Sequence, residues 1–537
     1  MQIIIKILKG IGKFIFTYKF SILFFAYLCV ITVLPNNYFS KPSIVNAASF
    51  FLFINIISKT RWKFVFSILL AYFLSFDAYF AFLYHLRAPI GIMASIFETN
   101  SAEAISMAKD FLPMALLILA ITTTLVYLSQ REWKAVRLSR KMSFFALLIY
   151  WIIFIPATLY WKGIRPPSAG EESSTPFTIV IQANVSEHFP LLYGDILTIY
   201  AYKSELAKLK EYQHTVRVIP EGMVMTDSLN APEKIFLVIG ESSLREHYSL
   251  YGYPVRTTPF LDSLSHVEHS PLNYYDGIAA APITREALRI MLTFSTPNDF
   301  EPFFKETNII DLANRNGYET IWISNHDLVG LYDSYIGFIS SNTQRSFYEK
   351  TVERKDINLI PPIRKMYEKG KKQFFVIHLI GSHMQYSDRY DKVDREAIAD
   401  NASKTVNYDR SIHHTDRTLR EITKIALQDS SSVIYYMSDH GEIINTGHGF
   451  IGQSVEQFHS PLITINNSQI PIDSIVSKYI DPTNRLIGGN STVYILSEIL
   501  GYSIPEKDVE KAVEDGQYIF HVDEKVYLYE DLKKRNP

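Results

Sequence analysis

The chain has 537 residues, and its formal charge of −2 conceals two parts of opposite sign. Residues 1–161 hold 15 Lys and Arg against 5 Asp and Glu, a net charge of +10, whereas residues 162–537 hold 38 against 50, a net charge of −12. The acidic part argues against nucleic acid as a partner. The single cysteine, Cys29, excludes a disulfide framework and a zinc site built on cysteines.

Five apolar stretches within the first 161 residues have the composition of membrane-spanning helices. They run over residues 14–34, 42–58, 64–86, 111–130 and 142–161. Because about 20 apolar residues cross a hydrocarbon core of roughly 30 Å, we expect residues 1–161 to be a transmembrane domain of five spans, with 42–58 the weakest. Asp77 lies inside the third stretch. A charge there is a candidate functional group, with exposure to interfacial water as the simpler alternative.

The loops between these stretches alternate in charge. One set of loops comprises the segment before the first stretch with its opening residues, the loop between the second and third stretches, and the loop between the fourth and fifth. This set holds twelve Lys and Arg, whereas the other loops hold three. The positive-inside rule therefore predicts a cytoplasmic N-terminus, and an odd number of spans carries the rest of the chain across the membrane. We expect a linker and bridging segment over residues 162–232. Its stretch at 165–176 is rich in Pro and Ser.

Short apolar runs and amphipathic segments alternate in the remaining chain. Runs without polar alternation predict buried strands at 177–181, 234–240, 319–324, 373–380 and 432–438, and helical spacing predicts helices at 309–317 and 412–425. This order is typical of an α/β domain with a mainly parallel sheet, which we place at residues 233–537.

Polar side chains follow four of the predicted strands at the point where each strand ends. Ligands in such sheets bind beyond the carboxyl ends of the strands, so we expect these side chains to share one site. They are Glu241, Asn325 with His326, His383, and Asp439 with His440.

Glu241, Asp439 and His440 offer carboxylates and an imidazole without a thiolate. This donor set suits zinc, with manganese as the alternative, although a lone Asp–His pair can also be an ordinary loop contact. His448 either joins this site or lies on a solvated loop. The candidate nucleophiles are the hydroxyls of Ser242, Ser243 and Thr284.

Thr284 opens a segment with helical spacing of apolar residues, Leu288, Met291 and Leu292. A hydroxyl at that position can cap the helix, and the helix N-terminus can stabilise an anion such as phosphate. From the residues alone, Thr284 is either a nucleophile or an N-cap.

Three motifs resemble the signature of bacterial phosphoethanolamine transferases. They are the stretch at 236–260 (Phe-Leu-Val-Ile-Gly-Glu-Ser-Ser and onward), Gly-Ser-His at 381–383 and Ser-Asp-His-Gly-Glu at 438–442, in the family's order. Residues 97–104 also resemble the family's juxtamembrane stretch. The resemblance implies five spans followed by a periplasmic domain of the alkaline-phosphatase and sulfatase type, a sandwich around a mainly parallel sheet.

The resemblance also implies roles for single residues. Zinc, one or two ions, would be held by Glu241, the nucleophile Thr284, Asp439 and His440. The histidines His383 and His448 would contact the phosphoethanolamine or a second zinc and serve as acid or base. Substrate contacts would come from Asn325 and, near the membrane, from Asn100 and Glu103, with Thr99 beside them.

The implied function is transfer of phosphoethanolamine from phosphatidylethanolamine to lipopolysaccharide (lipid A or a core sugar), a glucan or another envelope glycan, through a covalent intermediate on threonine. The implied protein is a monomer of the bacterial inner membrane with its catalytic domain in the periplasm. Two departures favour an acceptor other than lipid A. No cysteine follows residue 29, and Val329 and Gly330 stand near the position of a family lysine.

Three other functions remain in competition. A phosphoglycerol transferase of the lipoteichoic-acid-synthase type would use the same ligands. A sulfatase or phosphatase is disfavoured because the region of Thr284 lacks the Cys/Ser-x-Pro-x-Arg motif. A non-enzymatic membrane sensor would not need the complete ligand set. We expect His413 and His414 to be surface or packing residues.

Overall fold

The computed structural model describes residues 10, 12–35, 41–85, 87, 93–94, 97, 101–161, 189–212, 215–226, 230–326, 334–351, 354–399, 401 and 403–535. The chain divides into two compact units, Met1–Thr99 with Glu103–Glu205, and Asn100–Ala102 with Leu206–Pro537. The predicted strand at 177–181 and the segment at 165–176 lie outside the described residues.

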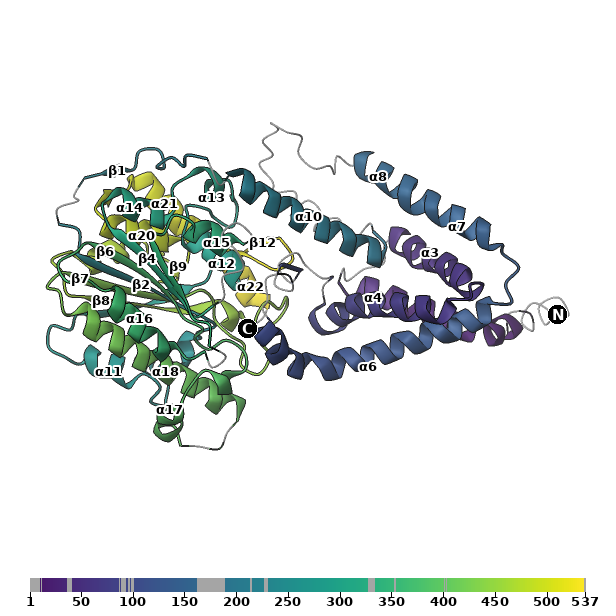
Figure 1. Cartoon of the computed structure of the whole chain (residues 1–537), viewed down its shortest axis with the longest axis horizontal. Helices are drawn as coiled ribbons and strands as arrows, with labels where there is room; N and C mark the ends of the chain where they lie inside the picture. Colours follow the sequence, from purple (N-terminus) through teal and green to yellow (C-terminus); the bar gives the residue numbers. More distant parts are fainter. Residues whose placement is uncertain are drawn as a thin grey trace. The chain divides into compact units, whose positions relative to one another are not determined.

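The first unit is helical (Figure 1). A helix forms at each of the five predicted apolar stretches, and three of them are long and apolar enough to cross a membrane: Lys63–Leu83, Phe111–Trp133 and Arg140–Ala157. Lys19–Val33 and Ile44–Ser58 are shorter, so five spans stay a prediction. The helices are α2 (Lys19–Val33), α3 (Lys41–Ser58), α4 (Lys63–Tyr84), α6 (Ser101–Trp133), α7 (Arg140–Leu148), the π-helical turn Ile149–Phe154, α8 (Ile155–Trp161) and the start of α10 (Leu191–Tyr212).

Side chains of this unit are apolar both inside and outside. Phe24, Phe50 and Leu74 are buried between the helices, whereas Leu117 and Ile152 are more than half exposed. Apolar residues on the outer surface are expected of helices whose outer face meets lipid.

Asp77 on α4 is buried rather than exposed to interfacial water, which contradicts the simpler alternative. Its Oδ1 lies 3.5 Å from Nε of Arg87. Arg87 also lies 3.9 Å from Oδ1 of Asp195 and donates to the carbonyl oxygen of Phe189 at 3.0 Å. These contacts join α4 to the start of α10, so we assign Asp77 a structural part in the first unit.

The second unit is built on an eight-stranded sheet with the order β5–β4–β6–β2–β7–β8–β3–β9. Every neighbouring pair is parallel except the two that involve β8, which confirms the predicted mainly parallel sheet. The strands are β2 (Lys234–Gly240), β3 (Leu272–Ile278), β4 (Glu319–Ser324), β5 (Arg345–Tyr348), β6 (Gln373–His378), β7 (Ser432–Ser438), β8 (His459–Asn466) and β9 (Ile487–Gly488). Two-stranded sheets pair β1 (Val224–Met225) with β10 (Tyr502–Ser503) and β11 (Tyr518–Phe520) with β12 (Val526–Leu528).

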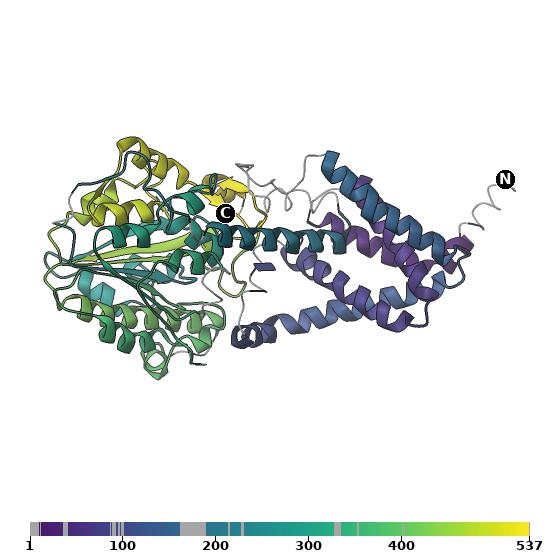
Figure 2. The ribbon, with the colours of Figure 1, turned by 45° about the horizontal axis from the view of Figure 1, so that its top comes forward.

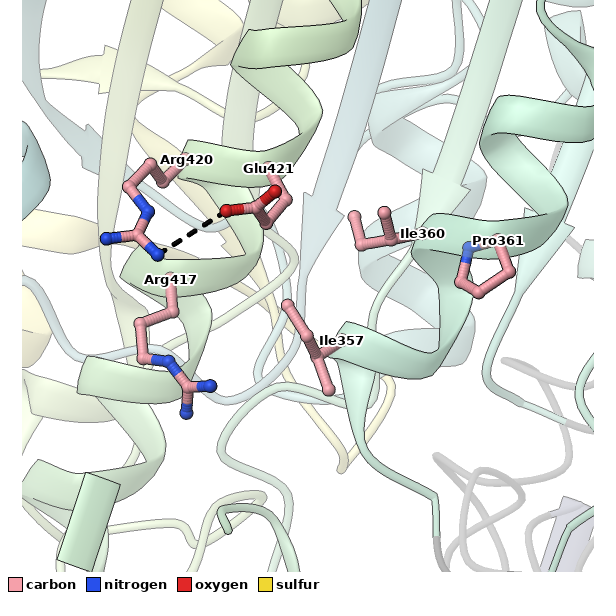
Figure 3. A pocket seen from close by; sticks show the side chains of 6 residues that line it. All are labelled: Ile357, Ile360, Pro361, Arg417, Arg420 and Glu421. Carbon is pink, nitrogen blue, oxygen red and sulfur yellow. Dashed lines mark ion pairs between the residues drawn. The ribbon is translucent and has the colours of Figure 1, made fainter. Parts of the chain in front are cut away.

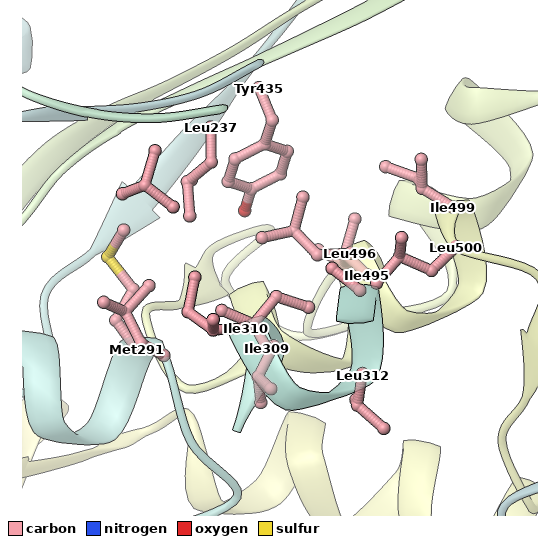
Figure 4. Close-up of a cluster of buried hydrophobic side chains, with 14 of the residues drawn as sticks. Leu237, Met291, Ile309, Ile310, Leu312, Tyr435, Ile495, Leu496, Ile499 and Leu500 are labelled. Carbon is pink, nitrogen blue, oxygen red and sulfur yellow. The ribbon is translucent and has the colours of Figure 1, made fainter. Parts of the chain in front are cut away.

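Helices cover both faces of the large sheet (Figures 1 and 2). On β2, Leu237 and Ile239 belong to one buried cluster, and Phe236 and Val238 belong to the other. Because successive side chains of a strand point to opposite faces, a strand buried on both faces has no polar alternation. Figure 4 shows the first cluster, where Leu237 lies with Met291, Ile309 and Leu496.

Helices of the first cluster are α12 (Thr284–Met291), α13 (Pro302–Lys305), α14 (Ile309–Arg315), α15 (Tyr335–Ser340), α19 (Ile472–Ser477), α20 (Ser491–Ile499) and α21 (Glu506–Asp515). Those of the second are α11 (Pro259–Ser265), α16 (Ile360–Met366) and α18 (Lys404–Ala426). The remaining two are α17 (Lys392–Ala397) and α22 (Tyr529–Arg535).

The predicted helices are present with shifted ends. Helix α14 begins where expected because Asn308 caps it and pairs reciprocally with Asp311. Helix α18 begins eight residues before the predicted start, since Ser403 accepts from the backbone N–H of Val406 and so caps a polar first turn.

Candidate metal and nucleophile site

The sheet brings the predicted polar residues to one edge. The four strands β4, β6, β2 and β7 are neighbours, with Ser324 opposite His378, His378 opposite Ile239, and Gly240 opposite Ser438. The residues that follow these four strand ends therefore start from the same edge of the sheet.

Glu241, Asp439 and His440 form a fully buried group at this edge. Nε2 of His440 lies 3.4 Å from Oε1 of Glu241 and 3.3 Å from Oδ2 of Asp439. A tetrahedral metal with ligand distances of about 2.0–2.1 Å separates its ligand atoms by roughly 3.3–3.4 Å. The observed spacing fits such an ion.

The hydrogen bonds of this group leave two atoms, on His440 and Asp439, free for a cation. Nδ1 of His440 lies 2.8 Å from the carbonyl oxygen of Gly441, which can only accept, so Nδ1 carries the proton and Nε2 offers its lone pair. Oδ1 of Asp439 accepts the backbone N–H of His440 at 2.7 Å, while Oδ2 is buried with no hydrogen-bond partner among the described residues. A buried carboxylate oxygen of this kind calls for a positive partner.

Electrostatics favour the same conclusion. Burial and then the neighbouring Glu241 carboxylate hold the pKa of Asp439 well above its ordinary value. For Glu241, burial acts in the same direction, but the imidazoles of His440 and His383 bring its pKa well below the ordinary range. Two neighbouring buried carboxylates do not readily ionise together, and a cation bound between them would relieve their repulsion.

Thr284 is the first residue of α12, and the N-cap is Ile283, whose side chain makes no capping bond. The N-cap interpretation of Thr284 is therefore wrong. Its Oγ1 donates to Oε2 of Glu241 at 2.9 Å and lies 3.4 Å from Nε2 of His440. Thr284 is half-buried, so it adds a fourth potential ligand, a hydroxyl oxygen, at the accessible side of the group.

Ser242 and Ser243 lie close to the same group but are fully buried. Ser242 donates to Oε1 of Glu241 at 2.8 Å, and Oγ of Ser243 accepts from the hydroxyl of Tyr436 at 3.2 Å. Both hydroxyls are enclosed, which leaves Thr284 as the accessible one of the three candidates.

His383 and His448 are half-buried beside the group. The ring of His448 lies 4.2 Å from that of His440 and 6.4 Å from that of His383. Nδ1 of His448 is held 2.7 Å from Oε2 of Glu442. Gly381, two residues before His383, has φ +51°, and a Cβ there would lie 2.5 Å from the carbonyl oxygen of Glu241, so this turn requires glycine.

Asn325 and Asp356 lie behind that turn. Nδ2 of Asn325 donates to Oδ1 of Asp356 at 2.8 Å, and Asp356 accepts the backbone N–H groups of Ile380 and Gly381 at 2.9 Å each. Asn325 is fully buried, so its amide nitrogen supports the turn that carries His383. No sequence pattern indicates Asp356, which stands outside every motif.

His326, which the sequence predicts at the shared site, and His378, which no motif singles out, also lie at this edge. His378, the last residue of β6, is fully buried and stacks on His326 with ring centroids 4.0 Å apart. Burial and then His326 hold the pKa of His378 well below its ordinary value, so its ring is neutral. A histidine inside an apolar strand gives little sequence signal.

Other residues singled out from the sequence fall elsewhere. Thr99, Asn100, Val329 and Gly330 lie outside the described residues, and of Glu103 only the helical backbone is described. His413 and His414 are buried packing residues rather than surface ones, and each places Nδ1 2.7 Å from Asp394.

A separate hollow of about 370 Å³ lies between α18, α16 and the turn Asp356–Leu359 (Figure 3). Its charged side chains are Arg417, Arg420 and Glu421, and Glu421 already pairs with Arg420 at 3.4 Å. Its lining residues include no imidazole or hydroxyl, in contrast to the group at the strand ends.

Comparison with known proteins gives three findings. Residues 233–500 match the Sulfatase family. Phosphoethanolamine transferase EptC of Escherichia coli K12 is 24% identical over 373 residues, which cover 65% of this chain and 63% of that protein. Phosphoethanolamine transferase OpgE of the same organism is 31% identical over 214 residues, which cover 38% of this chain and 39% of that protein.

This chain thus spans less than two thirds of the length of the curated relatives that it matches. The solved structure of the integral membrane protein lipooligosaccharide phosphoethanolamine transferase A (EptA) from Neisseria meningitidis shares the fold, with a TM-score of 0.60 at 16% identity over 90% of this chain and 95% of that one. Residues 233–500 therefore resemble the Sulfatase family, and the resemblance of this chain to the bacterial phosphoethanolamine transferases is confirmed.

Proposed function

We propose that this protein is a zinc-dependent transferase that moves phosphoethanolamine from phosphatidylethanolamine to an envelope glycan or lipopolysaccharide. The observation that carries the proposal is the hydroxyl of Thr284, held 2.9 Å from Glu241 and 3.4 Å from His440 at the accessible side of a buried donor group. Relatives named as phosphoethanolamine transferases support the head group.

Glu241, Asp439, His440 and Thr284 would hold the ion, and their two carboxylates, imidazole and hydroxyl suit zinc better than manganese. A bound zinc lowers the pKa of a coordinated hydroxyl and stabilises negative charge on phosphoryl oxygens. One ion satisfies this chemistry, and the number bound stays a prediction.

The protein's own residues supply positioning and proton transfer. The Thr284 hydroxyl releases its proton to solvent, and its Oγ1 then attacks phosphorus, so that a Thr284–phosphorus ester bond forms as the bond to the diacylglycerol oxygen breaks. That oxygen takes a proton from His383 or His448, and the backbone N–H groups at the start of α12 favour the anion. In the second half, the same histidine, now neutral, removes a proton from the acceptor hydroxyl or phosphate, whose oxygen bonds to phosphorus as the Thr284–phosphorus bond breaks and Thr284 leaves as its alkoxide.

The apolar helices of the first unit support a donor that is a membrane lipid. We propose five spans, a cytoplasmic N-terminus, a periplasmic second unit and a monomer, with Asn100 and Glu103 near the donor head group. The spent diacylglycerol also stays in the bilayer, which gives the membrane unit a purpose in the reaction.

The test is a head-group transfer assay with the full chain in vesicles. One set carries phosphatidylethanolamine labelled in ethanolamine, and the other carries phosphatidylglycerol labelled in glycerol. The proposal predicts zinc-dependent release of diacylglycerol from the first set only. Release from the second set alone would instead favour the phosphoglycerol transferase, and release from neither in a zinc-loaded protein would contradict both.

A further inference from the structure

Glu241 has potential metal ligands on both of its sides. The strand order β4–β6–β2–β7 places Asp439 and His440, after β7, on one side of the β2 end. His378 and His326, at the ends of β6 and β4, lie on the other.

The register places this second group on one face of the sheet. His378 is opposite both Ile239 and Ser324, and Ile239 faces the cluster that contains α12. Glu241 lies two residues after Ile239, and His326 lies two residues after Ser324. A step of two residues along a strand returns to the same face of the sheet. One ligand atom from each of Glu241, His326 and His378 lies within 4.8 Å of the others.

His378 is the least explained residue of this group. Its side chain is fully buried, and neither ring nitrogen has a hydrogen-bond partner in the part of the chain that the structure describes. A buried imidazole normally pairs at least one nitrogen. His326 is 23% exposed and places Nε2 4.0 Å from Oε2 of Glu241, so the group is reachable from outside.

We propose that Glu241, His326 and His378 form a second cation site that shares the Glu241 carboxylate with the first. Oε1 of Glu241 lies 3.4 Å from Nε2 of His440, while Oε2, which also accepts from Thr284, lies 4.0 Å from Nε2 of His326. Two imidazoles and a carboxylate are the donors that zinc and similar divalent cations take. The site is separate from the pair His383 and His448.

The second site is expected to be the weaker one. The carbonyl oxygen of Leu379 lies 2.8 Å from Nε2 of His326 and can only accept, so Nε2 carries a proton and must lose both the proton and this bond before it binds a cation. The first site has no such competitor, because Nδ1 of His440 rather than Nε2 makes the carbonyl bond.

The cluster of Asp391, Asp394 and His414 provides a contrast. Asp394 there already accepts from both neighbouring histidines and from Arg417 at 2.7 Å. Its oxygens are satisfied within the protein, so that cluster carries no such proposal.

The test measures metal occupancy without lipid, so its outcome does not depend on the transfer reaction. Full-length protein in detergent is stripped with a chelator and titrated with Co²⁺ by visible absorption, and Zn²⁺ equivalents are counted by elemental mass spectrometry. Wild type is expected to bind a tighter and a weaker equivalent. His326→Gln and His378→Gln each lose the weaker one, whereas Asp439→Asn loses the tighter one.

The exposed His266 provides a matched control, and His266→Gln should retain both equivalents. A paired His383→Gln and His448→Gln variant should also retain the weaker equivalent. The proposal is overturned if His326→Gln binds the same equivalents with unchanged affinities, or if only the paired variant loses the weaker one. His326→Gln decides the matter if His378→Gln fails to fold.

Discussion

Asp439 divides its two oxygens between the backbone and the candidate metal. Oδ1 accepts the N–H of His440 and Oδ2 lies 3.3 Å from Nε2 of that residue. Asp439→Asn keeps the size of the side chain but replaces a charged ligand by an amide. We expect zinc affinity at the first site to fall by more than about 100-fold, because outer-shell changes alone cost about 10–100-fold.

A competition titration with a chromophoric chelator measures this loss. Asp262→Asn is the control, because Asp262 bonds to Ser249 and Thr258 away from the site, and this variant should bind zinc like wild type. Unchanged affinity in Asp439→Asn would remove the aspartate from the ligand set.

The junction of α17 and α18 depends on one buried carboxylate. Asp394 bonds to His413, His414 and Arg417. Burial opposes its ionisation, but the hydrogen bonds from the two histidines bring the pKa of Asp394 far below its ordinary value. A depressed pKa means that Asp394 stabilises the fold above the unfolded pKa of about 4 and loses that effect as the pH falls.

Asp394→Asn is therefore expected to destabilise this junction by about 3–5 kcal/mol at pH 7, the typical cost of removing one partner of a buried ion pair. The difference from wild type should shrink below about pH 4. Hydrogen exchange of the α18 amides measures it, with the exposed Asp388→Asn as control. Equal loss at pH 7 and pH 3 would contradict the charged role.

Four strands of the large sheet, β2, β4, β6 and β7, were predictable because their interiors are buried on both faces and so show no alternation of polar residues. β2, β4 and β7 match their predicted bounds, and the polar residues after them do share one edge. His378 and Asp356 were not predictable, since their importance comes from the neighbours that the sheet register gives them.

Two features of the whole chain were visible in the sequence: a basic apolar part and an acidic α/β part. The helix Leu191–Tyr212 was not, because it lies in a segment predicted as a linker. Its buried residues, among them Ala201, Tyr202 and Leu209, follow no pattern strong enough to indicate a helix.

The proposed topology is testable in intact cells. In a Cys29→Ser background, Lys134→Cys lies in the loop between α6 and α7, and Lys525→Cys lies in the second unit. A membrane-impermeant maleimide should label Lys525→Cys in spheroplasts and Lys134→Cys only after permeabilisation. The reverse pattern would overturn the cytoplasmic N-terminus.

The central claim is that Thr284 carries the transferred group. The direct measurement is intact-protein mass spectrometry after incubation with phosphatidylethanolamine and zinc, followed by peptide mapping. The account predicts one phosphoethanolamine on Thr284, retained in Thr284→Ser and absent from Thr284→Ala. A folded, zinc-loaded protein without this adduct, or one that carries it equally in Thr284→Ala, would contradict the account.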